Sequence, residues 1–208
     1  MNTETQTATL TTEANTLKTI LSALDEYTSP DKARHVLTLA QAMPIIVEHI
    51  EGQPTTALSW SATNSTELVQ IDHRAEHTLT EPALIDPAAI LATLPKKATG
   101  DAVLTLTPEA WQLTTAGTTS TGPAAGEHQW PNTYGLFQGH GPEIAPYNID
   151  PTYLARLAKL AKTLKAERVR HVSQGHTDQK PNPNKPLLFT IDAGHLFARI
   201  LIMPQRTN

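Results

Sequence analysis

Apolar residues near the start of the chain recur with a helical period. Four of them keep the i, i+3, i+4, i+7 spacing of one helix face: Leu17, Ile20, Leu21 and Leu24. Thr12 precedes them and can cap this helix. Three alternating, β-branched segments follow, at residues 44–50, 57–63 and 68–72, and residues 51–54 predict a turn between the first two. The opening third therefore predicts one helix and three strands.

Two further helix starts have nearly the same sequence. Ile85-Asp86-Pro87 and Ile149-Asp150-Pro151 each place Asp where its carboxylate accepts first-turn amides, and Pro at the first helical position. They predict helices over about residues 87–94 and 151–164, side by side on one face of a sheet. The apolar residues expected to face inward are Ile90, Leu91, Leu94, Leu154 and Leu157.

Strand-like segments follow each of these helices. Residues 102–106 and 111–115 predict a hairpin, and residues 168–172, 187–191 and 197–203 predict three more strands. Residues 118–127 and 135–146 are interpreted as linkers, and residues 173–186, which contain three Pro, as an exposed loop. Three helix-plus-strand units predict an α+β fold with repeated β-α-β-β-β units and helices on one face of an antiparallel sheet.

Composition narrows the class of protein. The chain has 208 residues, 39% of them apolar and 17% charged, which indicates a folded core. No segment approaches the roughly 20 apolar residues of a membrane span, so a cytoplasmic protein without a membrane partner is expected. Cysteine is absent, which excludes disulfides and thiolate metal sites.

The net charge of the chain and the charge of its third helix favour different classes of protein. The formal net charge of −4 argues against a protein that coats nucleic acid. The third helix is nevertheless basic. Cations recur at every third residue along it and just after its expected end: Arg156, Lys159, Lys162, Lys165 and Arg168. These residues predict either a surface that contacts duplex DNA phosphates without reading bases, or a solvated face rich in a good helix former.

Signatures of catalysis are weak. His73-Arg74-Ala75-Glu76-His77 matches the H-x-x-E-H string of inverted zinc peptidases, which requires a helix. The string alternates like a strand, on which the two His would lie too far apart to share a metal. The chain also lacks a nucleophile elbow, a Walker-type loop and a G-x-G-x-x-G segment. A binding protein with no metal and no cofactor is predicted, rather than an enzyme.

Four segments resemble one family. Residues 185–190, a turn at 192–194 and residues 198–206 (ARILIMPQR) resemble the close of a bacterial DNA polymerase III β subunit, where the last strand ends in Met-Pro-Met-Arg. Asp150-Pro151-Thr152-Tyr153-Leu154 resembles the Asn-Pro-Lys-Tyr-Leu start of its last helix. Residues 57–68 and 130–134 are similar to two further clamp segments. The chain therefore resembles a shortened member of the DNA sliding-clamp superfamily.

The resemblance implies a fold and a function. It implies a DNA-clamp-like α+β chain, with residues 1–137 as a domain of two β-α-β units and residues 143–208 as a half-domain. It implies a non-catalytic replication accessory, a processivity factor that works as a homo-oligomer, holds double-stranded DNA by its backbone and tethers a polymerase. The alternative is an interaction or regulatory protein on a clamp-like scaffold that does not encircle DNA.

The resemblance also implies a pocket for a clamp-binding peptide. The matching positions are Thr63, Leu68, Tyr153, Leu201, Met203 and Pro204. The alternative is that these residues are core and complete the last strand. Two departures bear on the pocket: the family's Gly-His-Arg is Ser65-Thr66-Glu67 here, and its second terminal Met is Gln205. A full clamp has six units, and three are counted here.

Overall fold

The first part of the chain forms a strand, a helix and a three-stranded meander. The computed structural model describes residues 7–50, 53–126, 128–133, 136, 140–141, 147–166, 168–177 and 180–205. The elements are β1 (Ala8–Glu13), α1 (Ala14–Tyr27), the 3-10 helix η1 (Lys32–Thr38), β2 (Ala40–Ile50), β3 (Gln53–Thr63) and β4 (Glu67–His73). The predicted helix and three strands are confirmed. The chain before the helix is strand β1, which the sequence did not predict.

The middle of the chain forms a short helix and a three-stranded antiparallel meander. Its elements are β5 (Glu76–His77), β6 (Ala83–Ile85), α2 (Pro87–Leu91), β7 (Asp101–Leu106), β8 (Ala110–Thr115) and β9 (Thr118–Pro123). The predicted hairpin is confirmed as β7 and β8. The predicted linker at residues 118–127 is wrong over β9, because its β-branched threonines pair with β8 along all six residues.

The last part forms one helix and a longer meander. Its elements are β10 (His140–Gly141), α3 (Pro151–Thr163), β11 (Arg168–Thr177), β12 (Lys180–Pro181), β13 (Leu187–Ala193) and β14 (Leu196–Ile202). The exposed loop predicted at residues 173–186 is wrong in part, because β11 continues to Thr177 and pairs there with β12. Ser173 and Gln174 are buried within this strand.

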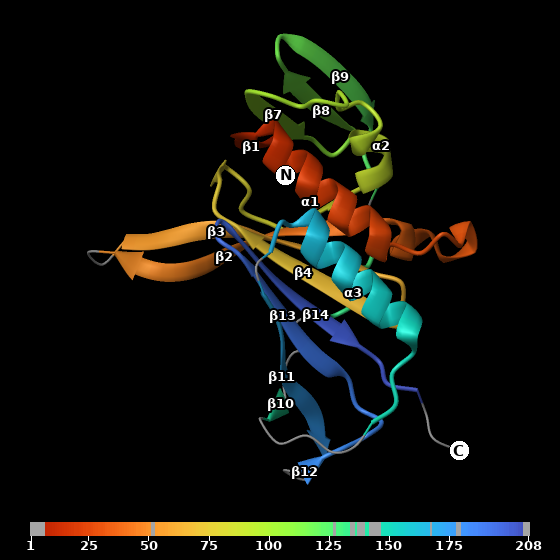
Figure 1. Ribbon diagram of the computed structural model, residues 1–208. Helices are drawn as coiled ribbons and strands as arrows, with labels where there is room; N and C mark the ends of the chain where they lie inside the picture. The colour runs from red at the N-terminus through yellow and green to blue at the C-terminus, as the bar shows by residue number, and fades with distance from the viewer. Residues whose placement is uncertain are drawn as a thin grey trace, which may run out of the picture.

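Two antiparallel sheets carry these strands. The smaller has the order β5-β1-β7-β8-β9, and the larger has the order β10-β11-β13-β14-β4-β3-β2-β6, with β12 beside β11. The larger sheet is joined at its centre by β4 and β14, which pair from Glu67–Ile202 to His73–Leu196. Helices α1 and α3 lie over the same face of this sheet (Figure 1). The predicted α+β class, with helices packed on antiparallel sheets, is confirmed.

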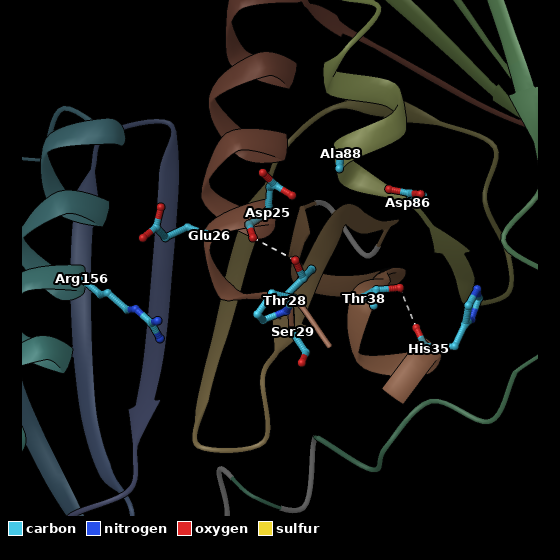
Figure 2. A pocket seen from close by; sticks show the side chains of 10 residues that line it. Asp25, Glu26, Thr28, Ser29, His35, Thr38, Asp86, Ala88 and Arg156 are labelled. Carbon is cyan, nitrogen blue, oxygen red and sulfur yellow. Dashed lines mark hydrogen bonds between the residues drawn. The ribbon is translucent and has the colours of Figure 1, made fainter. Parts of the chain in front are cut away.

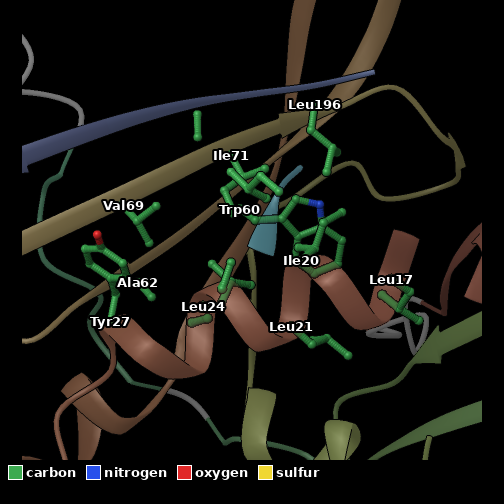
Figure 3. Packing of buried hydrophobic residues seen from close by; sticks show 14 of the residues in the cluster. Leu17, Ile20, Leu21, Leu24, Tyr27, Trp60, Ala62, Val69, Ile71 and Leu196 are labelled. Carbon is green, nitrogen blue, oxygen red and sulfur yellow. The ribbon is translucent and has the colours of Figure 1, made fainter. Parts of the chain in front are cut away.

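Helix α1 supplies the centre of the core. All four residues of its predicted apolar face have no exposed surface: Leu17, Ile20, Leu21 and Leu24. Ile20 and Leu24 pack toward Trp60 of β3 and Ile71 of β4, whereas Leu21 points away from these two strands (Figure 3). Burying each such side chain contributes about 1.5–3 kcal/mol, so this face fixes the helix on the sheet.

The two Asp caps agree with the sequence, whereas the cap predicted at Thr12 and the helix order do not. Thr12 lies in β1, and α1 begins after Glu13 with no side-chain cap. Asp86 accepts the Ala89 amide at 3.0 Å and Asp150 accepts the Thr152 amide at 2.8 Å. The two Asp-Pro helices are not neighbours as predicted, because α1 lies between them and packs against both.

The inward face of α3 also differs from the prediction. Leu157 is buried, but Leu154 is 45% exposed. Four large residues pack on the core, Tyr153, Leu157, Leu160 and Leu164, with Ala161 beside them. At about 100° per residue these four large residues fall within roughly 60° of one another, whereas Leu154 lies roughly 90° from their centre. Ile90 of α2 is buried, as is Leu94, which follows this helix, and Leu91 is half-buried.

Candidate functional site

Of the five cations predicted to face DNA, three lie on α3: Arg156, Lys159 and Lys162. A spacing of three residues turns about 300° on a helix, so each successive side chain lies about 60° behind the previous one. Over the two steps from Arg156 to Lys162 the direction therefore turns by about 120°. Lys165 follows the helix with a φ of 55°, and Arg168 is the first residue of β11. The five cations are regularly spaced in the sequence but do not share one face of a helix.

The first two cations are held by carboxylates within the protein. Arg156 Nη1 donates to Glu67 Oε2, and Lys159 Nζ donates to Glu26 Oε2. Glu26 lies on α1 and Glu67 on β4, so both pairs join α3 to the first part of the chain. The hydrogen bond from Arg156 to Glu67 raises the pKa of the guanidinium. These two cations are already neutralised.

Glu67 is the buried member of this network. Its side chain has no exposed surface, whereas that of Arg156 is 41% exposed. Asn64 Nδ2 donates to the same carboxylate oxygen at 3.2 Å, and the other oxygen has no hydrogen-bond partner among the described residues. Burial, followed by the charge of Glu67, raises the pKa of the neighbouring Tyr27 phenol. Arg156 thus compensates a carboxylate that water does not reach.

The remaining three cations are exposed. Lys162, Lys165 and Arg168 have no ion pair within the described part of the chain. Lys165 and Arg168 line a hollow of about 300 Å³ together with Asp192, Ala193 and Gly194. The cationic surface is therefore concentrated at the end of α3 and the start of β11, and not along the whole helix.

An acidic cavity of about 650 Å³ lies at the opposite flank of α3. Figure 2 shows Asp25 and Glu26 from the end of α1 and Asp86 from the cap of α2, with Arg156 on the other side. Burial, then the charges of Asp86 and Glu26, raises the pKa of Asp25. No cluster able to hold a metal ion occurs among the described residues. Sequence reasoning missed this cavity because its walls come from four separate segments.

The residues of the predicted peptide pocket lie around the β4–β14 junction. Thr63 is the register partner of Leu68, and Leu68 is the partner of Leu201. All three are buried. Because neighbouring strand residues point to opposite faces and Val69 faces the helices, Leu68 and Leu201 lie on the face away from the helices. Tyr153 packs on the helix side, so the sheet separates part of the predicted set.

The C-terminal segment joins these parts at the rim of the sheet. The Met203 amide donates to the Thr66 carbonyl at 3.1 Å, beside the β3–β4 turn. The Gln205 amide donates to the Asn148 carbonyl at 2.8 Å, next to the start of α3. Met203 is 39% exposed and Pro204 is buried. The rim thus presents one accessible thioether, a soft apolar contact suited to an apolar peptide.

The histidines of the H-x-x-E-H string lie on strands, as the alternation predicted. His73 is on β4 and His77 on β5. His73 is buried, and its Nε2 shares a hydrogen bond of 3.2 Å with Thr12 Oγ1 of β1. Burial, then the charge of His195, lowers its pKa to about 4. His73 therefore works as a neutral contact between the two sheets.

No described helix is long and apolar enough to cross a membrane.

This arrangement of helices on antiparallel sheets is the DNA-clamp fold. The chain matches a DNA polymerase sliding clamp from Pseudomonas aeruginosa with a TM-score of 0.68 and 13% identity, over 96% of this chain and 67% of that one. It matches the DNA polymerase III β subunit of Thermotoga maritima with a TM-score of 0.67 and 9% identity, over 100% and 68%. A sliding clamp from Caulobacter crescentus gives 0.61 and 12%, over 100% and 68%.

The chain is accordingly a shortened, clamp-like protein. It spans about two thirds of the length of the bacterial β clamps that it matches. No protein-family model matches the sequence, and no curated protein matches it. At these identities the likeness shows the fold alone.

Proposed function

We propose that this chain is a non-catalytic, cytoplasmic, clamp-like replication accessory. It holds duplex DNA through phosphate contacts without sequence specificity, works as a homo-oligomer and tethers a polymerase or another peptide-bearing partner. We divide it into a clamp-like domain at residues 1–137 and a half-domain at residues 143–208. One observation carries the proposal: on a clamp fold, exposed cations gather at one end of α3, at Lys162, Lys165 and Arg168.

The number of free cations sets the expected strength of binding. Each neutralised phosphate contributes a slope of about −0.9 to the dependence of log K on log salt. Three contacts therefore give a slope of roughly −3 for each chain. Binding of this kind is weak and sensitive to salt, which suits a protein held on DNA by several copies acting together.

Matched charge reversals test the proposal. Lys162→Glu with Lys165→Glu should abolish salt-sensitive association with a primed circular duplex, because both side chains are exposed and off the buried stripe. Lys180→Glu with Lys185→Glu changes the net charge equally at another exposed site and should leave association intact. Equal losses in the two double variants, or no association of the wild type at low salt, would refute DNA binding through this surface.

The second candidate is an interaction protein that does not hold DNA. The observation that favours it is the neutralisation of Arg156 and Lys159 by Glu67 and Glu26, beside a cavity walled by Asp25 and Asp86. An acidic flank repels phosphate. Partner capture that persists while DNA association is absent at every salt concentration would favour this candidate over the first.

A further inference from the structure

The turn between β3 and β4 supports the C-terminal rim through one side chain. The Met203 amide donates to the Thr66 carbonyl at 3.1 Å. Thr66 is held in turn by Asn64, whose Oδ1 accepts from the Thr66 amide at 3.1 Å and from the Thr66 hydroxyl at 2.9 Å. The Glu67 amide donates to the same oxygen at 2.9 Å. A single amide oxygen therefore fixes the part of the turn to which Met203 is bonded.

The orientation of Asn64 depends on two charged residues. Because three donors occupy Oδ1 of Asn64, its Nδ2 is the group that turns toward Glu67, and it donates to Oε2 at 3.2 Å. Arg156 Nη1 donates to that same oxygen from α3. The Glu67 side chain has no exposed surface, so water does not compete for this carboxylate. Arg156 therefore sets the direction of the Glu67 carboxylate, and the carboxylate sets the direction of Asn64.

The same turn is strained at Ser65. This residue has a φ of 80°, in the left-handed region that residues other than glycine rarely adopt. Such a conformation persists only where the surrounding contacts impose it. The Ser65 amide donates to Thr63 Oγ1 at 3.2 Å, and the Ser65 hydroxyl accepts from Arg34 at 3.2 Å. Because a strained turn relaxes when its restraints are removed, we expect its shape to change when the Asn64 contacts are broken.

We propose that Arg156 is a positioning residue for the partner-binding rim, acting through Glu67 and Asn64 on the turn that supports Met203. The inference rests on the proposed function, which makes the rim a docking surface for an apolar peptide. Arg156 thus has a role other than the phosphate contact expected from its place in the basic sequence. A peptide meets a Met203 backbone that is already fixed, which lowers the ordering cost of binding.

Methionine methyl NMR measures the rim directly. The chain has three methionines, so a spectrum of 13C-labelled methyl groups contains few signals, and Met203→Leu identifies the signal of the rim. Arg156→Leu with Glu67→Leu removes both charges and leaves Asn64 Nδ2 without its acceptor. The Met203 signal of this double variant should shift or broaden. The signal of Met43 should stay in place, because Met43 lies on β2 and not at the turn.

Two further variants make the NMR result specific. Asn64→Ala breaks the chain of hydrogen bonds at its middle and should displace the Met203 signal in the same way. Lys159→Leu is the matched control, because Lys159 is also paired on α3 but its partner is Glu26 of α1. An unchanged Met203 signal in the double variant, or an equal displacement in Lys159→Leu, would overturn the proposal.

The double variant also separates positioning from general stability. Removing the whole buried pair is often neutral for stability, so the melting temperature and the Met203 signal should respond differently. If Arg156 only stabilised the fold, a double variant with wild-type stability would also have the wild-type Met203 signal. That result would overturn the proposal even if the single variant Arg156→Leu did not fold.

Peptide capture distinguishes a failure of this inference from a failure of the proposed function. The probe is a fluorescein-labelled peptide with two leucines between polar residues, followed by fluorescence anisotropy. The double variant should bind it about two- to tenfold more weakly, as expected when a side chain must be ordered on binding. Equal affinity of the wild type and the double variant would overturn the positioning role. A Met203 signal that responds while the wild type binds no peptide would support the positioning of the rim and refute the proposed tethering.

Discussion

Replacing Arg156 with leucine should destabilise the protein by leaving a buried carboxylate without its cation. Glu67 has no exposed side-chain surface, and after the change only Asn64 would still donate to it. Removing one partner of a buried pair typically costs about 3–5 kcal/mol. Arg156 is 41% exposed, so solvent screens its side of the pair, and we expect about 2–4 kcal/mol.

Urea denaturation at pH 7 measures this loss directly. For a chain of this size the same loss corresponds to a melting temperature lowered by roughly 5–15 °C. Lys159→Leu is the matched control, because Lys159 is also paired but its side chain is 64% exposed. We expect that control to cost less than about 1 kcal/mol.

The double variant separates the pair from its surroundings. Arg156→Leu with Glu67→Leu removes both charges, and replacing a whole buried pair by apolar residues is often neutral. We expect it to recover most of the stability that the single change loses. If the single change costs less than about 1 kcal/mol, or if the double variant is as unstable as the single one, Arg156 does not stabilise the buried carboxylate of Glu67.

Two further predictions concern His73 and the C-terminal rim. The pKa of His73 is lowered to about 4, so the folded state binds fewer protons than the unfolded chain, and stability should fall as pH drops from about 6.5 to 4. His73→Gln should reduce the difference in unfolding free energy between pH 7 and pH 5, measured by urea titration. An unchanged difference would contradict a lowered pKa of His73. Met203→Ala should weaken capture of an apolar partner peptide by about 1–3 kcal/mol with little change in melting temperature, since Met203 is exposed. Tyr153→Ala should lower both peptide capture and the melting temperature, because Tyr153 also packs on the core. A Met203 variant that loses only stability would assign Met203 to the core.

Periodicity alone recovered most of the elements. The helix with Leu17 and Leu24, the hairpin of β7 and β8 and the two Asp caps each depend on local spacing, which a sequence displays directly. Strand β9 was mistaken for a linker because Thr, Ser and Gly are common in both settings. Only its pairing with β8 decides between them.

The candidate site was less accessible to sequence reasoning. The cations of α3 are regularly spaced, but a period of three is not the helical period, and the sequence does not say which flank meets α1. Glu67 and Arg156 are 89 residues apart, and the contact between them depends on the β4–β14 joint. Long-range pairing of this kind leaves no periodic signal.

The β4–β14 joint has a consequence for how the chain folds. Residues 196–202 leave the ribosome long after residues 67–73, so β4 has no partner on one side until β14 has been made. Contacts of such sequence separation must overcome loop-closure entropy before they contribute, which slows folding. During that delay the apolar side chains of β4 lie beside an unpaired strand edge, a combination prone to intermolecular aggregation. Synthesis of β14 thus determines when the nascent chain becomes safe from aggregation.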